Sequence, residues 1–184
     1  MNTPSEFNAY LSTVAHCSRD KEGKRILIDS SESVVNFDAV KEDYAKKNSP
    51  DQTPASADGL FLDSSGDYVL VEFKAGDQKK HEILKKAYDS AIILSDLKNK
   101  NIAWVRNNVK FILVFYPEKA SKDENINSRN NLYNQGTKNS SKPILIYLKP
   151  VSHFLYDNVY ELTPEDFSDQ YLQCSNPNSR SNDP

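Results

Sequence analysis

The sequence predicts an α/β protein with a mixed β-sheet flanked by helices. Two short apolar runs, GLFL and YVLVEF, are separated by the turn sequence SSGD and predict a β-hairpin. A long amphipathic stretch follows the hairpin, and a continuous apolar run, VKFILVFY, comes next. This alternation of strands and helices is typical of α/β folds, and we expect a sheet of about four or five strands.

The composition is that of one soluble domain. The chain has 184 residues, a net charge of -3 and 38% hydrophobic residues. No apolar run approaches the roughly 20 residues of a membrane span, and the first residues, MNTPSEFNAY, lack a signal-peptide pattern. We therefore expect a cytoplasmic protein with one domain over residues 1–174 and a disordered tail over residues 175–184.

The cysteines and histidines are scattered along the chain. Cys17 and Cys174 lie near opposite ends, and the three histidines have no metal-ligand spacing. We expect free thiols and no zinc site.

Two helices and an edge strand are expected before the hairpin. Residues 1–18 carry apolar side chains at helical spacing after a candidate cap, Ser5. Residues 24–31, KRILIDSS, predict a short edge strand. Residues 34–47 predict a second helix, and the loop that follows is rich in Pro and Ser.

From the hairpin onward, strands and helices alternate. The expected elements are strands at 59–63 and 68–74, a helix at 78–99, a strand at 109–116, a polar loop at 117–142, a strand at 143–150 and a helix at 162–173. Asp77 is a candidate cap of the long helix. Thr163 and Pro164 have the cap and first-turn residue types of a helix start.

Charged residues interrupt the apolar hairpin. Asp58 precedes the first strand, whereas Glu72 and Lys74 lie two residues apart on the second. Side chains at positions i and i+2 of a strand point to the same face. Pairing across the SSGD turn would bring Asp58 beside Glu72, so two carboxylates and one ammonium group are expected to converge.

This combination of groups suits phosphodiester hydrolysis. Mg²⁺ or Mn²⁺ binds one or two carboxylates together with water and substrate phosphate. A lysine such as Lys74 can orient the attacking water or stabilise the developing negative charge. The alternative is an ordinary half-exposed hairpin in which charged and apolar residues alternate.

The order of these residues resembles the PD-(D/E)XK nuclease superfamily. The matching positions are Asp58, Glu72 and Lys74, and the strings SADGLFL, VEFKAG and KKAYDSAIILSD are similar to those of uncharacterised bacterial and phage-encoded members. The resemblance covers about residues 35–116 and implies a restriction-endonuclease-like fold. The family's first motif is often Pro-Asp, whereas this chain has Ala57-Asp58.

The resemblance implies further site residues. Family members often add an acidic metal ligand from the preceding helix, for which Asp38 and Glu42 are candidates and Glu6 is a weaker one. Every one of them is also an ordinary solvated helix acid.

Members of this family often have a Gln or Lys at the start of the helix after the E-x-K motif, where such a residue can contact phosphate. Gln78, Lys79 and Lys80 occupy that place, with a plain polar helix end as the alternative. Lys85 and Lys86 follow and are expected to form an exposed lysine face, which aids solubility or steers nucleic acid.

Two functions are therefore expected in order. The first is a metal-dependent nuclease using Mg²⁺ or Mn²⁺, with DNA favoured over RNA, in phage defence, a mobile element or a toxin system. The second is a catalytically silent module that binds a protein partner, such as an immunity or accessory protein. A chain of this size has no separate DNA-reading domain, so sequence specificity would need a homodimer or a partner.

Overall fold

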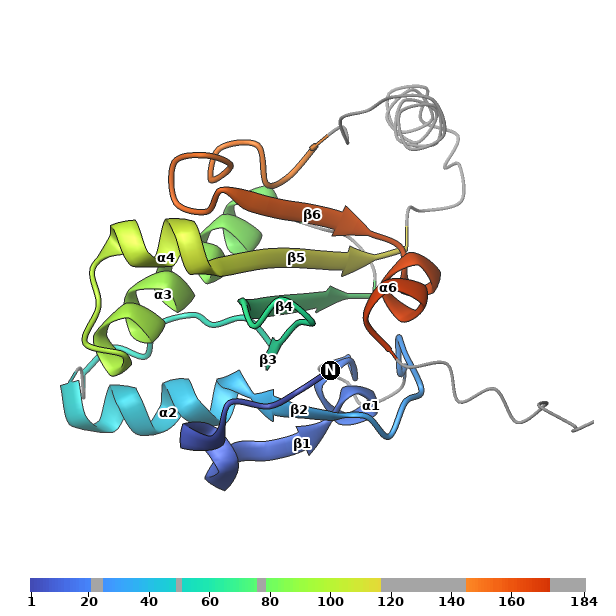
Figure 1. Cartoon of the computed structure of the whole chain (residues 1–184), viewed down its shortest axis with the longest axis horizontal. Coiled ribbons are helices and arrows are strands. Elements are labelled where there is room, and N and C mark those ends of the chain that lie inside the picture. The colour runs from blue at the N-terminus through green and yellow to red at the C-terminus, as the bar shows by residue number, and fades with distance from the viewer. Residues whose placement is uncertain (21–24, 49–50, 76–78, 117–144, 173–184) are drawn as a thin grey trace, which may run out of the picture.

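A six-stranded mixed sheet forms the centre of the molecule (Figure 1). The computed structural model describes residues 1–20, 25–48, 51–75, 79–116 and 145–172. The strands lie side by side in chain order: β1 (Leu11–Thr13), β2 (Ser33–Asn36), β3 (Gly59–Leu62), β4 (Tyr68–Lys74), β5 (Val109–Phe115) and β6 (Asn158–Leu162). The predicted class, an α/β protein with a mixed sheet flanked by helices, is confirmed.

The strand pairing changes from antiparallel to parallel at β4. β1 to β4 pair in antiparallel fashion, whereas β4, β5 and β6 are parallel. A parallel pair needs a crossover connection, and between β4 and β5 this connection contains α3 (Lys80–Leu97) and α4 (Ile102–Asn108). The carboxyl ends of three strands therefore meet at one edge of the sheet.

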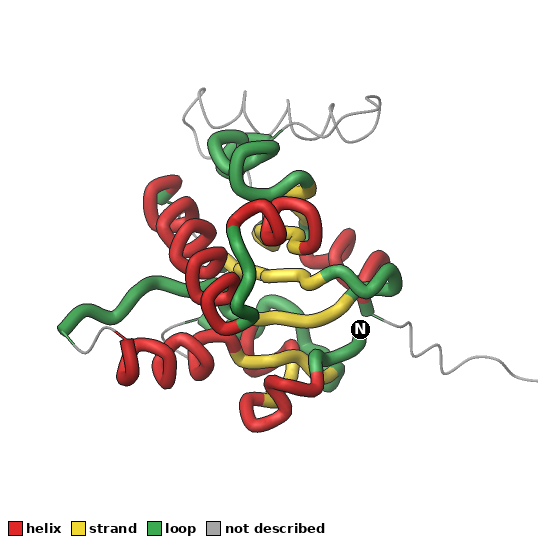
Figure 2. Tube along the Cα trace, turned by 60° about the vertical axis from the view of Figure 1, so that its left-hand side comes forward, coloured by secondary structure: helices red, strands yellow, loops and turns green. Residues whose placement is uncertain are grey.

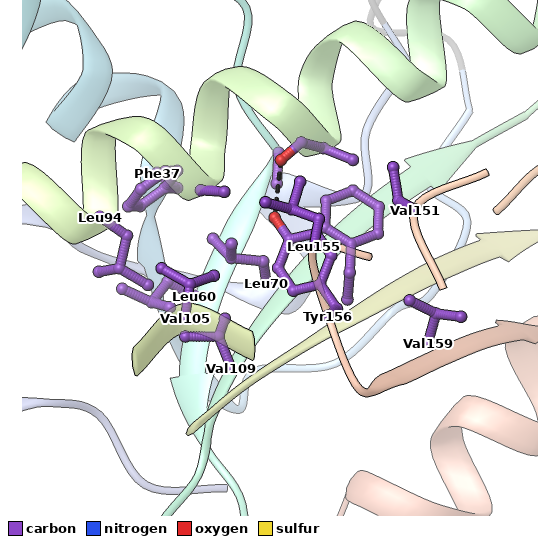
Figure 3. Packing of buried hydrophobic residues seen from close by; sticks show 14 of the residues in the cluster. Phe37, Leu60, Leu70, Leu94, Val105, Val109, Val151, Leu155, Tyr156 and Val159 are labelled. Carbon is purple, nitrogen blue, oxygen red and sulfur yellow. Dashed lines mark hydrogen bonds between the residues drawn. The ribbon is translucent and has the colours of Figure 1, made fainter. Parts of the chain in front are cut away.

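Helices cover both faces of the sheet (Figure 2). On one face, Leu70 of β4 packs into a cluster that includes Phe37 of α2 (Phe37–Asn48) and side chains of α3 and α4 (Figure 3). On the other face, Val69 and Val71 pack with Val14 of α1 (Val14–Cys17) and with α6 (Pro164–Tyr171). β4 can alternate between two apolar clusters because successive strand residues point to opposite faces.

Tyr156 joins the segment before β6 to the long helix. Its side chain is fully buried, and its hydroxyl donates a 2.7 Å hydrogen bond to the carbonyl of Ala87 on α3 (Figure 3). A buried phenol needs such a partner, so this contact fixes the loop against α3.

The first third of the chain departs from the predictions. Residues 1–18 form a 3-10 helix (η1, Ser5–Tyr10), β1 and the short α1 in place of one helix. The expected edge strand at 24–31 is wrong, since the described part contains only an isolated bridge between Arg19 and Ile26. The second helix begins at Phe37, because β-branched Val34 and Val35 belong to β2 and pair with β1 on one side; Val35 also pairs with β3.

The end of the sheet also differs. The expected strand at 143–150 is wrong, because residues 146–150 form bends and turns and β6 takes the edge position. The helix α4 was not predicted.

Thr163 does cap α6, accepting a 3.1 Å hydrogen bond from the amide of Asp166. The predictions for Asp77, for residues 117–142 and for the tail at 175–184 lie outside the described residues.

In the described part of the chain, no helix is both long enough and apolar enough to cross a membrane.

Candidate functional site

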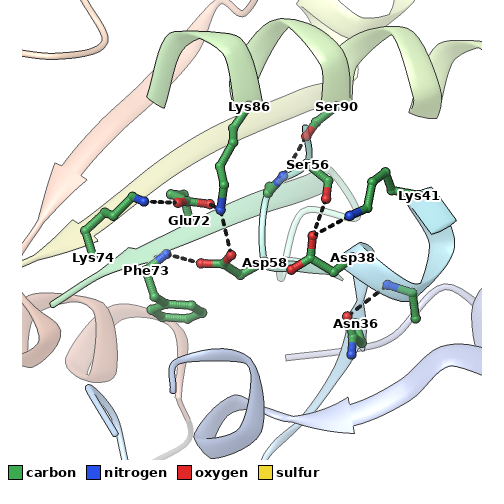
Figure 4. A network of polar contacts seen from close by, with 12 residues as sticks. Asn36, Asp38, Lys41, Ser56, Asp58, Glu72, Phe73, Lys74, Lys86 and Ser90 are labelled. Carbon is green, nitrogen blue, oxygen red and sulfur yellow. Dashed lines mark hydrogen bonds and ion pairs between the residues drawn. The ribbon is translucent and has the colours of Figure 1, made fainter. Parts of the chain in front are cut away.

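The hairpin brings Asp58 beside Glu72 (Figure 4). Gly59 pairs with Val71, and the amide of Asp58 donates a 3.0 Å hydrogen bond to the carbonyl of Val71. Asp58 Oδ2 in turn accepts a 2.7 Å bond from the amide of Phe73. Backbone pairing alone therefore places the aspartate carboxylate against the strand that carries Glu72.

Gly59 allows close packing next to this aspartate. A Cβ at position 59 would lie 3.0 Å from methyl groups of both Val34 and Val71. A side chain here would force these two methyl groups to shift, so glycine lets β3 pack against both valines without that displacement.

Glu72 is fully buried on the face of β4 that α3 covers. Its Oε2 accepts a 2.7 Å hydrogen bond from Lys86 Nζ, and Lys74 Nζ lies 3.3 Å from Oε1. The contact with Lys74 is an ion pair without hydrogen-bond geometry, so Oε1 is a buried oxygen that accepts no hydrogen bond among the described residues. A buried acceptor left in this state is unusual and marks the group as a ligand candidate.

Lys86 joins the two carboxylates. Its Nζ also lies 2.9 Å from Asp58 Oδ1, so one ammonium group bridges Asp58 and Glu72 (Figure 4). The expectation that Lys86 is exposed was wrong, since its side chain is only 17% exposed. A signal existed in the spacing: Ile83, Lys86 and Ser90 lie three and four residues apart, so they share the buried stripe of α3.

Two further α3 side chains hold the loop before Asp58. Ser90 Oγ accepts a 2.8 Å bond from the amide of Ala57, and Asp89 Oδ2 accepts a 2.8 Å bond from the amide of Ala55. The sequence had suggested no role for Asp89. Both contacts anchor the approach to β3 on the same helix that supplies Lys86.

Asp38 is the nearest additional acid. It lies in the first turn of α2, where its Oδ1 accepts a 2.5 Å bond from Ser56 and pairs with Lys41 at 3.3 Å (Figure 4). The other candidates lie elsewhere. Glu42 is exposed further along α2, and Glu6 binds Tyr68 and Lys98 at the opposite end of β4. Asp38 is close enough to Asp58 that its charge adds to the rise in the pKa of Asp58.

The two central carboxylates have raised pKa values. Burial raises the pKa of Glu72 to about 8; repulsion from Asp58 adds to the effect, and Lys86 and Lys74 oppose it. Burial also raises the pKa of Asp58, against the lowering effects of Lys86 and the Phe73 amide. Burial lowers the pKa of Lys86, but the charges and hydrogen bonds of Asp58 and Glu72 raise it by more, so the lysine pKa lies above its usual range. Lys86 is therefore a permanent cation between two acids that are difficult to ionise together.

The thiol of Cys17 is a close neighbour of this cluster. Burial raises its pKa to about 12; a hydrogen bond with Ser12 opposes the shift, and the charges of Asp58 and Asp38 add to it. Cys17 is a free thiol, as expected, but its high pKa makes it a poor nucleophile. Cys174 lies outside the described residues.

The predicted phosphate contacts are only partly described. Gln78 lies outside the described residues. Lys79 is 69% exposed just before α3 and pairs with Glu82 at 3.5 Å. Lys80 is exposed in the first turn and acts electrostatically on Glu161 of β6. Neither lysine contacts Asp58 or Glu72 in the described structure.

The residues fit a metal site with two protein ligands rather than three. Within the described ranges, no group of three or more His, Cys, Asp or Glu side chains is arranged to hold a metal ion. Asp58 and Glu72 nevertheless direct oxygens at one point, and Glu72 keeps an oxygen that accepts no hydrogen bond. Mg²⁺ commonly takes one or two carboxylates and fills its other positions with water and phosphate oxygens.

Fold and site together describe an α/β protein in which the buried Glu72 and the partly buried Asp58 lie next to two lysines. In comparisons with known proteins, no family model, curated sequence or solved structure matches the chain.

Proposed function

We propose that this protein is a metal-dependent nuclease that hydrolyses phosphodiester bonds, with DNA favoured over RNA. The observation that carries the proposal is the convergence of Asp58 and Glu72 on one point, with Lys74 beside the buried Glu72. The resemblance to the PD-(D/E)XK superfamily rests on these same three residues, and a restriction-endonuclease-like fold is part of the proposal.

Asp58 and Glu72 would hold Mg²⁺ or Mn²⁺, with Asp38 as the candidate for a further acid at the site. The bound cation would neutralise phosphate charge and lower the pKa of a water ligand. The Phe73 amide holds Asp58 in position, and burial restricts the movement of Glu72. Lys74, whose side chain is 19% exposed, stands where it can orient the attacking water and bind the phosphate oxygen that gains charge.

A second candidate is a silent nuclease-like module that binds a protein partner. One observation favours it: the ammonium of Lys86 already neutralises both acids. A pair of carboxylates stabilised in this way needs no metal, and an acidic chain with a net charge of -3 has no general attraction for nucleic acid.

Metal binding and plasmid nicking on the same samples separate these candidates. Calorimetry with Mg²⁺ and Mn²⁺ would be performed on the wild type and on Glu72→Ala, followed by nicking of supercoiled DNA and cleavage of a single-stranded RNA. We expect Glu72→Ala to lose both metal binding and nicking. Glu165→Ala, an exposed glutamate on α6, is the matched control and should retain both. A wild type that binds neither cation would refute the nuclease and leave the binding module.

A further inference from the structure

Lys86 occupies the point at which the two carboxylates converge. Its Nζ lies 2.9 Å from Asp58 Oδ1 and 2.7 Å from Glu72 Oε2, and the side chain reaches down from α3 into the site (Figure 4). Glu72 is fully buried, and the side chains of Lys86 and Asp58 are only 17% and 16% exposed, so solvent screens this contact less than a surface ion pair.

A divalent cation needs these same two oxygens. Mg²⁺ binds carboxylate oxygens at about 2.1 Å, which is closer than an ammonium nitrogen approaches them. A cation bridging Asp58 Oδ1 and Glu72 Oε2 would therefore lie where Lys86 Nζ now lies. The two positive charges cannot share this position.

We propose that Lys86 is an internal counter-ion that a divalent cation must displace in order to bind between Asp58 and Glu72. This inference rests on the proposed metal site. It assigns to Lys86 a role that the motif residues do not have: it holds the two acids together before the metal arrives and weakens the affinity of the site for metal.

The lysine side chain is suited to this exchange. It is a flexible four-carbon chain with a point charge, whereas the backbone donor to Asp58 is fixed in the hairpin. Once displaced, the Lys86 ammonium stays on α3 within a side-chain length of the site. There it can pair with a phosphate of the substrate, so metal and nucleic acid are expected to strengthen each other's binding.

The test is the affinity for Mn²⁺ of Lys86→Met, measured by calorimetry at low ionic strength. Methionine keeps most of the apolar stem and removes the charge. We expect Mn²⁺ to bind this variant at least about tenfold more tightly than it binds the wild type, within the usual range of coupling between two sites. The matched control is Lys85→Met, which removes the same charge from the next, exposed position and should leave the affinity close to that of the wild type.

A double variant separates competition from a general effect of charge. Adding Glu72→Gln to Lys86→Met should abolish the gain in affinity, because the carboxylate that receives the metal is gone. Equal Mn²⁺ affinities for Lys86→Met and the wild type would overturn the proposal, as would an equal gain in Lys85→Met.

Lys86→Met leaves Asp58 and Glu72 facing each other without a shared cation, which destabilises the metal-free fold, so a second variant and a second readout are needed. Lys86→Gln keeps a hydrogen-bond donor, and its thermal midpoint should rise more on addition of Mn²⁺ than that of the wild type. Refolding of Lys86→Met by Mn²⁺, followed by circular dichroism, would support the proposal. An equal rise in Lys86→Gln and the wild type would refute it.

The outcome for Lys86 can be told apart from the outcome for the nuclease. Tighter metal binding in Lys86→Met without nicking by any variant would support the counter-ion and refute the nuclease. If nicking depends on Glu72 but Lys86→Met binds metal with unchanged affinity, the nuclease proposal would stand and the counter-ion proposal would be refuted.

Discussion

Glu72 and Glu161 are two buried glutamates at the same level of one sheet, and their surroundings are opposite. Both lie opposite Leu113, Glu72 on β4 and Glu161 on β6. Glu161 accepts hydrogen bonds from the amides of Ile146, Tyr147 and Leu148, at 3.1, 2.6 and 2.7 Å. Glu72 is held by two lysine side chains and retains an oxygen that accepts no hydrogen bond.

This difference decides whether each carboxylate can exchange its present partners for a metal ion. Backbone amides cannot leave Glu161 without unfolding the loop at 146–148, so the role of this carboxylate is structural. Lysine side chains can leave Glu72 by rotating about their own bonds. Only the second arrangement can give up its partners to a metal ion, although burial raises the pKa of both glutamates.

The largest expected effect is the loss of stability when Glu161, the structural acid, is replaced. Glu161→Ala removes the acceptor from three backbone amides and should lower the free energy of unfolding by about 3 kcal/mol. Urea unfolding measures it, with the exposed Glu82→Ala as control. If Glu161→Ala unfolded at the urea concentration of the wild type, Glu161 would not be the structural acid of the pair.

The next largest effect is the loss of nicking when Lys74, a partner of Glu72, is replaced. Lys74→Met should reduce nicking by about 100-fold, within the range for loss of a group that assists proton transfer. Metal binding should persist, because both carboxylates remain. Nicking assays and calorimetry on the same preparation test this, with the exposed Lys100→Met as control. Joint loss of metal binding and nicking would make Lys74 a support of Glu72 rather than a participant in the chemistry.

A smaller effect concerns pH. The pKa of Glu72 rises from 4.5 to about 8 on folding, so between these values the folded state binds more protons than the unfolded state. The contribution of Glu72 is therefore fully present below pH 4.5 and is lost as the pH rises through 8. The Glu72→Gln variant should show a flatter profile and be more stable than the wild type at pH 8, where part of the wild-type Glu72 must be ionised in the folded state. Urea unfolding at several pH values measures this difference, and parallel profiles for the two proteins would contradict it.

The smallest effect concerns the anchor before Asp58. Ser90→Ala leaves the buried amide of Ala57 without its acceptor and should lower the free energy of unfolding by about 1 kcal/mol. Thermal unfolding measures the change, and Ser64→Ala in the exposed turn is the control. An unchanged midpoint in Ser90→Ala would mean that the Ser90 contact does not stabilise the loop.

Local patterns in the sequence were enough for the hairpin and for the placement of its charges. The turn SSGD sets the register, the period of two puts Glu72 and Lys74 on one face, and counting from the turn brings Asp58 next to them. The cap at Thr163 follows for the same reason, since it depends on residues three positions apart.

The contacts that depend on strand order were decided by the tertiary structure. The parallel pairing of β6 with β5 joins segments separated by more than 40 residues, and no local pattern shows that NVYEL is preferred to PILIYL as the sixth strand. The position of Glu161 beside the amides of residues 146–148 follows from that pairing. Spacing alone places Lys86 on the same stripe of α3 as Ile83 and Ser90, but the contact with Glu72 exists only because that stripe lies on β4. The sequence by itself determined which acids meet, and only the folded sheet decided which cation lies between them.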